Sequence, residues 1–434
     1  MFTTFRNAWK VPELRKKIIY TLLIILVFRI GCHIPVPFLD AAVLNSMISE
    51  GGSFLSYMDI LSGGALSQGT LFALAVQPYI NASIIVQLLT YALPPLENLQ
   101  KEGEEGRKKI QKITSFVALG IALVMSYAYY VTQRNYGAVM YTQGASGVLT
   151  AIVIIAAFVA GANLVVWLGN SINEKGLGNG LSIIIFAGIV SRGPSSVLAM
   201  FEQIKSDMKF ALIVPIVLIV FVLMIGFIVF MNESERRIPI QYAKRVVGRR
   251  QYGGQNTHIP IKVAMSGVMP IIFAMSIMSL PSTLEMFVPV AANPETGLQK
   301  FYAGFIHFFN YTSPWYAVIY FVLIIAFNYF YVAMQYNPIE IANNLRQNNG
   351  GIPGIRPGKP TSDYIQRVLS KITFIGAVFL GIIAIFPIIT GMAFPTLNIS
   401  MGGTSILIIV SVILETVRTL ESQMMMCHHK GFLE

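Results

Sequence analysis

Charged residues are scarce in this sequence. Asp, Glu, Lys and Arg make up 12% of the 434 residues, whereas hydrophobic residues make up 55%; soluble proteins carry about twice that charged share. So few charges cannot cover a water-facing surface. The apolar residues fall in blocks of roughly twenty, the length of helix that crosses the hydrocarbon core of a bilayer. The composition therefore excludes a soluble globular protein and predicts an all-α polytopic membrane protein.

Cysteine is almost absent, since the chain has only Cys32 and Cys427, near its opposite ends. The topology predicted below places them on opposite sides of the membrane, so we expect no disulfide. Cys427 precedes His428 and His429; this trio could bind a metal, but a solvated tail is the favoured interpretation. The first apolar block lacks a small-residue cleavage pattern after it, and we interpret it as a retained span.

Groups that carry catalysis are also missing. Glu415 is the main acidic residue inside the predicted spans, and the histidines are scattered. The glycine-rich segment 176–180 lacks the strand and the lysine of a phosphate-binding loop, so we interpret it as a tight turn. We expect neither an enzyme nor a cofactor. Ion-coupled transport, which generally needs buried ion ligands, is disfavoured but stays an alternative. A purely structural scaffold would not explain the glycine-rich motif at 62–67.

Ten apolar blocks are candidate spans. They cover residues 18–34, 70–92, 112–132, 148–169, 181–200, 210–231, 263–282, 314–333, 371–390 and 403–424. We expect the fifth span to end early, at Arg192-Gly193-Pro194, and the seventh to carry Pro270 inside it. Ten spans divide into two halves of five, 1–200 and 201–434. An odd number per half would give the halves opposite topology and pseudo-symmetry, although no sequence repeat supports this division.

The positive charge lies mainly on one side of these spans. Of the 31 Lys and Arg residues, 25 fall in alternate connecting segments and the two termini. The positive-inside rule places those segments, and so both termini, in the cytoplasm. Two of the cytoplasmic loops, at about 232–260 and 335–370, are longer than a connection needs. We expect them to form a docking surface.

Motifs spread along the chain narrow the function. They are Ser-Gly-Gly-Ala-Leu-Ser at 62–67, Pro-Tyr-Ile-Asn-Ala-Ser at 78–83, Lys-Glu-Gly-Glu-Glu-Gly-Arg at 101–107, Gly-Asn-Gly-Leu-Ser at 178–182, Arg-Arg-Ile-Pro at 236–239, Tyr-Ala-Lys-Arg at 242–245, Pro-Gly-Ile-Arg-Pro-Gly at 353–358 and Gly-Gly-Thr-Ser at 402–405. In this order they resemble the SecY family of protein-conducting channel subunits. The resemblance runs from about residue 15 to 426.

The resemblance implies a passive channel in the bacterial cytoplasmic membrane. Such a channel passes unfolded secretory polypeptides and releases transmembrane segments sideways into lipid. It implies SecE and SecG as companion subunits, SecA or the ribosome as the driving partner, and signal sequences and preproteins as substrates.

The resemblance also assigns a pore ring of aliphatic side chains. The matching positions are Val76, Ile80, Leu181, Ile185, Ile272 and Ile408. Branched aliphatic side chains can close around any polypeptide and exclude water when the pore is empty, which blocks ions. Ordinary packing inside a span is the alternative for each residue alone.

A plug is implied at about 57–68, just before the second span. Its residues are Asp59, Ile60, Leu61, Ser62, Gly63, Gly64, Ala65 and Leu66. We expect a short turn with few apolar contacts, because a segment that leaves the pore should be weakly anchored. A loose external loop is the alternative.

Two further sets of residues follow from the resemblance. The lateral gate, between the second and third spans and the seventh and eighth, would hold the polar residues Asn81, Ser83, Gln87, Thr90 and Ser266. Ala264 stands where the family commonly has Asn, which predicts a gate that opens more easily. The docking face for SecA and the ribosome would hold Arg237, Lys244, Arg245, Arg249, Arg250 and Arg356.

Overall fold

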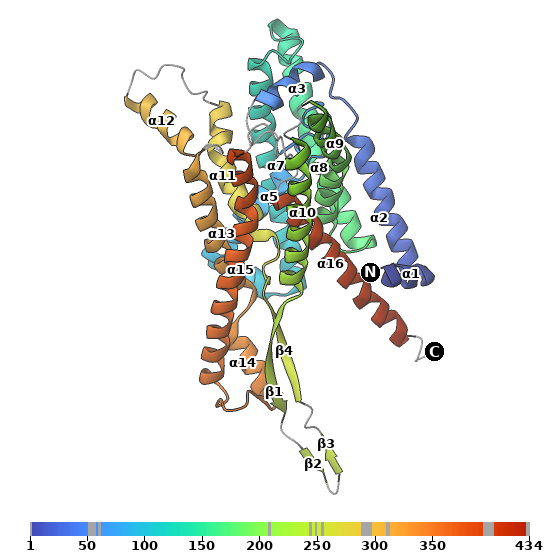
Figure 1. The fold of residues 1–434 in the computed structure, drawn as a ribbon, viewed down its shortest axis with the longest axis vertical. Helices are drawn as coiled ribbons and strands as arrows, with labels where there is room; N and C mark the ends of the chain where they lie inside the picture. The colour runs from blue at the N-terminus through green and yellow to red at the C-terminus, as the bar shows by residue number, and fades with distance from the viewer. Residues whose placement is uncertain are drawn as a thin grey trace.

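A computed structural model of the chain describes residues 2–50, 58–59, 62–206, 210–242, 245–247, 250–252, 256–287, 297–309, 313–393 and 403–430. Helices stand at all ten predicted spans (Figure 1). They are α2 (Pro12–Gly31), α5 (Gln77–Ala92), α7 (Glu104–Asn135), α8 (Gly144–Lys175), α9 (Gly180–Ser206), α10 (Phe210–Glu233), α11 (Met269–Phe287), α13 (Pro314–Gln335), α15 (Lys359–Ala393) and α16 (Gly403–Lys430).

Shorter helices lie between these long ones. They are α1 (Phe2–Lys10), α3 (Ala41–Glu50), α6 (Pro94–Lys101), α12 (Gly297–Phe308) and α14 (Pro338–Gln347). α6 follows α5 after a bend of 98°, at Leu93, which precedes two prolines. A residue before proline is driven from the helical into the extended region, and Leu93 has a ψ of 115°. The bend therefore follows from the sequence.

Length and hydropathy identify several of these helices as membrane spans. Within the described residues, five helical segments are long and apolar enough to cross a bilayer, and the bent pair α5–α6 makes a sixth. The five are Glu104–Asn135, Gly144–Lys175, Val214–Glu233, Pro314–Gln347 and Lys359–Thr390. α9 and α11 contain shorter apolar helices, Gly180–Ser195 and Met269–Pro281.

Three predictions about helix ends were wrong. The second span was expected from residue 70, but α5 begins at Gln77 with Pro78 in its first turn, where proline costs no hydrogen bond. Likewise α11 begins at Met269, so Pro270 lies at its start rather than inside it. The fifth span was expected to end near Pro194, but α9 runs through that residue to Ser206.

Two of the apolar clusters among the described residues lie where the site is built. One cluster contains buried side chains of α10, α11, α13, α15 and α16, and Ile84 of α5 also belongs to it. Another gathers side chains of α2, α8, α9 and α16 around the segment before α5. The division at residue 200 is not tested by this packing and stays a prediction.

The two oversized loops join in one small sheet, which the sequence analysis did not predict. Strand β1 (Glu235–Tyr242) pairs antiparallel with β4 (Asn256–Lys262) and with β5 (Gly350–Gly351), giving the order β4-β1-β5. A hairpin of β2 (Arg245–Val247) and β3 (Arg250–Tyr252) extends the tip (Figure 1). Ile238, Ile240 and Ile261 pack against Leu345 and Ile352 from the other loop. The loops therefore form one platform rather than two independent arms.

Candidate functional site: pore, plug and lateral seam

Aliphatic side chains from three parts of the chain meet beside the start of α5. Val76, Ile185 and Ile408 are buried in one cluster, and Ile80 and Leu181 pack against it. Ile272, the sixth residue expected in the ring, is half-buried on α11 and does not belong to this cluster. The structure thus brings together five of the six predicted ring residues.

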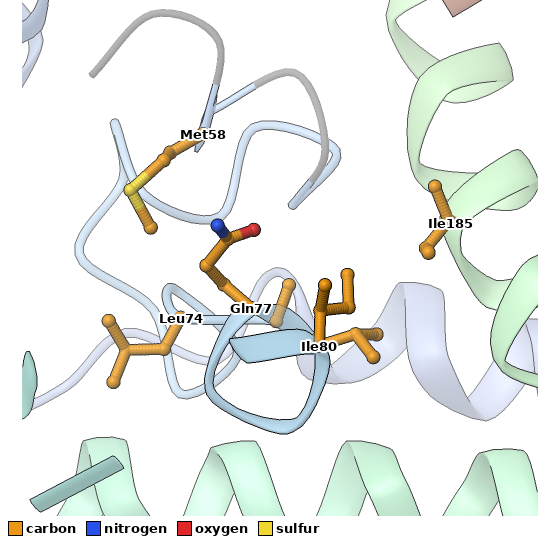
Figure 2. Close-up of a pocket in the computed structure, with 7 residues that line it drawn as sticks. Met58, Leu74, Gln77, Ile80 and Ile185 are labelled. Carbon is orange, nitrogen blue, oxygen red and sulfur yellow. The ribbon is translucent and has the colours of Figure 1, made fainter. Parts of the chain in front are cut away.

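A small pocket adjoins this cluster and shares some of its residues. It is lined by Met58, Leu74, Ala75, Val76, Gln77, Ile80 and Ile185. Figure 2 shows Ile80 and Ile185 on different helices, with Met58 and Gln77 on the other side of Ile80. The space is about the size of one water molecule. All its lining side chains except Gln77 are apolar.

The segment expected to be the plug folds into a tight buried turn. We call residues 58–59 and 62–67 the plug turn. Of the rest of the expected plug, residue 57, Ile60 and Leu61 lie outside the described residues, and Gln68 is exposed. The Ser62 hydroxyl donates to the carbonyl of Asp59 (3.0 Å) and accepts from the amide of Leu66 (3.2 Å). The Asp59 carboxylate accepts from the amide of Ser67 (2.8 Å). These bonds close the turn on itself.

Side chains of three helices hold the plug turn from outside. Arg29 of α2 donates through Nη1 to the carbonyl of Gly63 at 3.0 Å. Arg192 of α9 forms an ion pair with Asp59 and donates through Nη2 to the hydroxyl of Ser67 at 3.2 Å. Cys32 and Tyr129 add two further bonds. The sulfur of Cys32 lies 3.6 Å from the carbonyl oxygen of Ser62, and the hydroxyl of Tyr129 donates to the carbonyl of Leu66 at 3.1 Å.

The expectation of a weakly anchored plug was therefore wrong. Ser62 and Ala65 are 0% exposed, and Leu66 is 1% exposed. The glycine pair lets the arginines approach, because a Cβ on Gly63 would lie 3.0 Å from Arg29 Nη1 and one on Gly64 would lie 3.1 Å from Arg192 Nε. Both glycines also have positive φ, +70° and +89°, which side chains other than glycine rarely adopt.

The polar residues expected at the lateral gate bond elsewhere. Thr90 bonds to the carbonyl of Val86 one turn earlier (2.7 Å), and Gln87 donates to Ser83 of the same helix (3.5 Å). Asn81 Nδ2 lies 3.8 Å from the sulfur of Met125 on α7.

The remaining gate residue, Ser266, lies just before α11. It donates to Asn328 of α13, whose amide donates in turn to the carbonyl of Thr373 (2.8 Å). Among the described residues, none of these hydrogen bonds joins α5 or α7 to α11 or α13. The hydrogen bonds of these residues therefore stay on their own side of the boundary, and their role in a lateral gate stays a prediction.

Apolar contacts close this boundary instead, and we call it the seam. Ile84 of α5 is 4% exposed and belongs to the same cluster as Ile271 and Phe273 of α11. Tyr91, in the last turn of α5, meets Phe330 of α13 edge to face, with ring centroids 5.7 Å apart. Both contacts join one half of the chain to the other. Ala264 is half-buried in the turn before α11.

The basic residues of the docking face lie on the platform where the structure describes them. Arg237 is exposed on β1 and pairs with Glu235 (2.6 Å). Arg245 and Arg250 lie on the hairpin strands β2 and β3, whereas Lys244 and Arg249 lie outside the described residues. Arg356 is exposed in the turn after β5, and its carbonyl accepts a hydrogen bond from Thr361 (2.8 Å).

At the base of the platform, Lys262 of β4 has a lowered pKa. Burial is the main cause, the positive charge of Arg418 adds to it, and Glu235 opposes it. Arg418 of α16 donates to the carbonyl of Asn232 in the last turn of α10 at 3.1 Å, so these two helices are bonded to each other directly before β1 begins.

Comparison with known proteins decides the family. The SecY family model matches residues 70–417, four-fifths of the chain. The chain belongs to the SecY family. The protein translocase subunit SecY of Streptomyces griseus is 41% identical over 444 residues, and that of Thermotoga maritima is 40% identical over 440 residues. These alignments cover all of this chain and 100% and 98% of the two relatives.

Solved structures of SecY-type channels share the fold. One is a SecY protein whose plug domain is described as stabilising the closed state of the translocation channel and maintaining a membrane seal; it superimposes with a TM-score of 0.65 at 18% identity. Sec61 in the canine ribosome-channel complex superimposes with a TM-score of 0.60 at 18% identity. Each alignment covers 94% of this chain and 92% of the other. The SecY fold predicted from the motifs is thus confirmed.

The motif comparison missed the residues that hold the plug turn. The motifs did not include Arg29, and Arg192 was considered only as part of the segment expected to end the fifth span. Charged residues at membrane depth usually pair with one another or with backbone carbonyls. Applied to Arg29 and Asp59, that rule would have predicted that both side chains have buried polar partners. It does not say which partner each side chain finds.

Proposed function

We propose that this chain is the channel subunit of a protein translocase and passes unfolded secretory polypeptides across the bacterial cytoplasmic membrane. The supporting observation is the meeting of Val76, Ile80 and Ile185 directly beneath a buried plug turn. Aliphatic side chains make no directional bonds, so they can part for any sequence and close again behind it. An empty aliphatic constriction also excludes water and ions.

The proposal gives the other ring residues the same role. Leu181 and Ile408 complete the constriction on the side of α9 and α16. Ile272 joins it when α11 moves, since that helix bounds the seam. The plug turn covers the constriction at rest and leaves it when a polypeptide enters.

The seam is proposed as the lateral gate. A signal sequence or a transmembrane segment is an apolar helix, and it can replace the contacts of Ile84 and Tyr91 with contacts of its own. The exchange buries similar apolar area in both states, so its net cost is small. Transmembrane segments would leave through this opening into lipid.

The chain itself catalyses no covalent step in this proposal. SecA or the translating ribosome supplies the energy from the cytoplasmic side, where the platform carries the exposed Arg237 and Arg356. SecE and SecG accompany the chain in the membrane, and both of its termini lie in the cytoplasm. The likeness to a channel in a ribosome complex supports the ribosome as a partner.

Reconstituted transport tests the proposal. Proteoliposomes that hold the chain with SecE and SecG receive SecA, ATP and an unfolded secretory preprotein, and protease-protected preprotein is measured. ATP-dependent protection is expected. Its absence, while a characterised SecY complex transports in parallel, would overturn the proposal. Ion-coupled solute uptake by the same liposomes would favour the transporter alternative.

The docking role of Arg356 has its own test. Arg356→Glu should reduce SecA-driven protection at least tenfold while leaving the amount of inserted channel unchanged. Arg346→Glu is the matched control, because Arg346 is an exposed arginine of the same loop outside the turn that follows β5. Equal transport by the two variants would remove Arg356 from the docking face.

A further inference from the structure

Two arginines from different helices converge on the plug turn. Arg29 is the only Lys or Arg residue within the first predicted span, and its Nη1 lies 3.0 Å from both the carbonyl of Gly63 and the hydroxyl of Ser191. It therefore joins α2, the plug turn and α9 through one guanidinium. Ser191 also donates to the carbonyl of Gly188 (2.6 Å), which fixes its hydroxyl toward Arg29.

Arg192 follows Ser191 directly and takes the other side of the plug turn. Its guanidinium pairs with Asp59, whose side chain is 6% exposed. Asp59 is at the same time the acceptor for the amide of Ser67, and Ser67 accepts from Arg192. Asp59, Ser67 and Arg192 thus form a closed triangle of bonds that links the two ends of the plug turn to α9.

Asp59 offsets the positive charge of this cluster only while the plug turn is in place. Two guanidiniums hold the plug turn, Arg29 at the carbonyl of Gly63 and Arg192 at the carboxylate of Asp59, so one carboxylate accompanies two positive charges. When the plug turn leaves, Arg29 and Arg192 lose Asp59 and the carbonyl of Gly63 together. Two like charges then remain near each other without the carboxylate that offset one of them, and their repulsion disfavours the released state.

We propose that Arg29 and Arg192 act as a charged latch on the plug turn, with Asp59 as its release element. This inference rests on the proposed role of the plug turn as a seal. Opening breaks the Asp59–Arg192 ion pair and the Arg29–Gly63 bond. These polar bonds set the threshold for opening, whereas the apolar pore ring sets the tightness of the constriction beneath it. Arg29 and Arg192 are positioning residues and need not touch the polypeptide.

The structure supplies a native reporter for the latch. Cys32 is 1% exposed, and its sulfur lies under the carbonyl of Ser62. Departure of the plug turn uncovers this thiol, so its alkylation rate by a small maleimide measures release. A Cys427→Ser background leaves Cys32 as the only thiol of the chain.

The experiment compares latch variants in proteoliposomes that contain the complete channel. Ion conductance and the alkylation rate of Cys32 are both measured at rest. Asp59→Asn should raise both at least tenfold, because it removes the ion pair with Arg192 and the one negative charge beside the two guanidiniums. The double variant Asp59→Asn/Arg192→Gln should leak less than Asp59→Asn alone, since it removes one of the opposed positive charges. This non-additivity is the signature of a latch.

Two controls separate charge from folding. Thr70→Val removes the bond from Thr70 to the carbonyl of Ala65 (3.1 Å) at the end of the plug turn but contacts neither arginine, and it should leave both readouts near those of the parent. Arg134→Gln removes an exposed arginine at the end of α7 and should do the same. Ser67→Ala is the milder latch variant should Asp59→Asn fail to insert, and a several-fold rise in both readouts is expected.

Deletion of residues 57–68 distinguishes the two proposals. A leaky deletion together with latch variants as tight as the parent would overturn the latch and keep the plug. A deletion that is itself tight would overturn the plug as a seal. Equal effects of Thr70→Val and Ser67→Ala would also overturn the latch, because any loosening of the turn would then suffice.

Discussion

The plug turn and the seam are both closed in this structure, but by opposite means. The plug turn is held by an ion pair and by hydrogen bonds from Arg29, Arg192 and Tyr129. The seam is held by Ile84 in an apolar cluster and by the Tyr91–Phe330 ring pair. Directional bonds resist until they break, whereas apolar contacts can be exchanged for others of the same kind. We therefore expect the two closures to open in different ways. The plug turn opens when a conformational change breaks its bonds, and the seam opens when an apolar helix replaces its contacts.

The largest expected effect on this contrast comes from Ile84→Ala. Truncating a buried isoleucine costs about 2–5 kcal/mol, and here the loss falls on the contact between α5 and α11. We expect the seam to open more readily, so that preproteins with weakened signal sequences are accepted about a hundredfold better in the transport assay. Ion conductance at rest should change far less than in a latch variant.

The neighbouring residue provides the control for this substitution. Ile85 is 43% exposed, so Ile85→Ala removes the same atoms without loosening the seam. Equal acceptance of weak signals by both variants would show that the packing of Ile84 does not hold the seam.

A smaller effect is expected from Gly63→Ala, which acts on the plug turn alone. A left-handed backbone costs alanine about 1–2 kcal/mol, and its Cβ would also press on Arg29 and Ser191 at 3.0 Å. The closed state is expected to lose about 2 kcal/mol, roughly a thirtyfold shift in the ratio of open to closed channels. Single-channel recording measures that ratio.

Gly137→Ala separates the two causes. Gly137 has a similar φ of +75°, but a Cβ there would meet nothing within 4 Å. It carries the backbone cost without the contact with Arg29, and it lies outside the plug turn. Leak from this variant equal to that of Gly63→Ala would remove the arginine from the explanation.

The smallest effect is expected from Tyr91→Leu. It removes the edge-to-face pair with Phe330, worth about 0.5–1.5 kcal/mol beyond the area buried, and part of that is retained because Tyr91 is 67% exposed. Acceptance of weak signals should rise about threefold. Phe116→Leu, which changes a 77% exposed ring on α7, should leave acceptance unchanged; a rise of the same size there would count against the ring pair.

Most of the fold could be predicted from the sequence because a bilayer accepts few structures. Backbone groups in lipid must be satisfied internally, so each apolar block of roughly twenty residues became a helix. The errors lie where proline and glycine occur. Pro78 and Pro270 were counted inside spans but start helices, and the turns before them bring Val76 and Ser266 to the positions described above.

The site could be predicted only in part. Motif resemblance placed Val76, Ile80, Leu181, Ile185 and Ile408, and packing brought them together. It could not say that Ser266 would find Asn328 rather than a residue across the seam, since a hydroxyl bonds to whichever partner the packing presents. It also could not show that β5 would join β1, because pairing between distant segments depends on how the helices between them are placed.

The sequence by itself determined the membrane setting, the ten helices and the uneven distribution of positive charge, since each depends on composition and local periodicity alone. Tertiary structure alone decided how the plug turn is held. Arg29, Asp59 and Arg192 are far apart in the chain. The sequence around Asp59 does not identify which basic residue pairs with its carboxylate. Only the packing of α2 and α9 around the turn brings Arg192 to Asp59 and Arg29 to the carbonyl of Gly63. A buried charge is stable only where such a partner meets it.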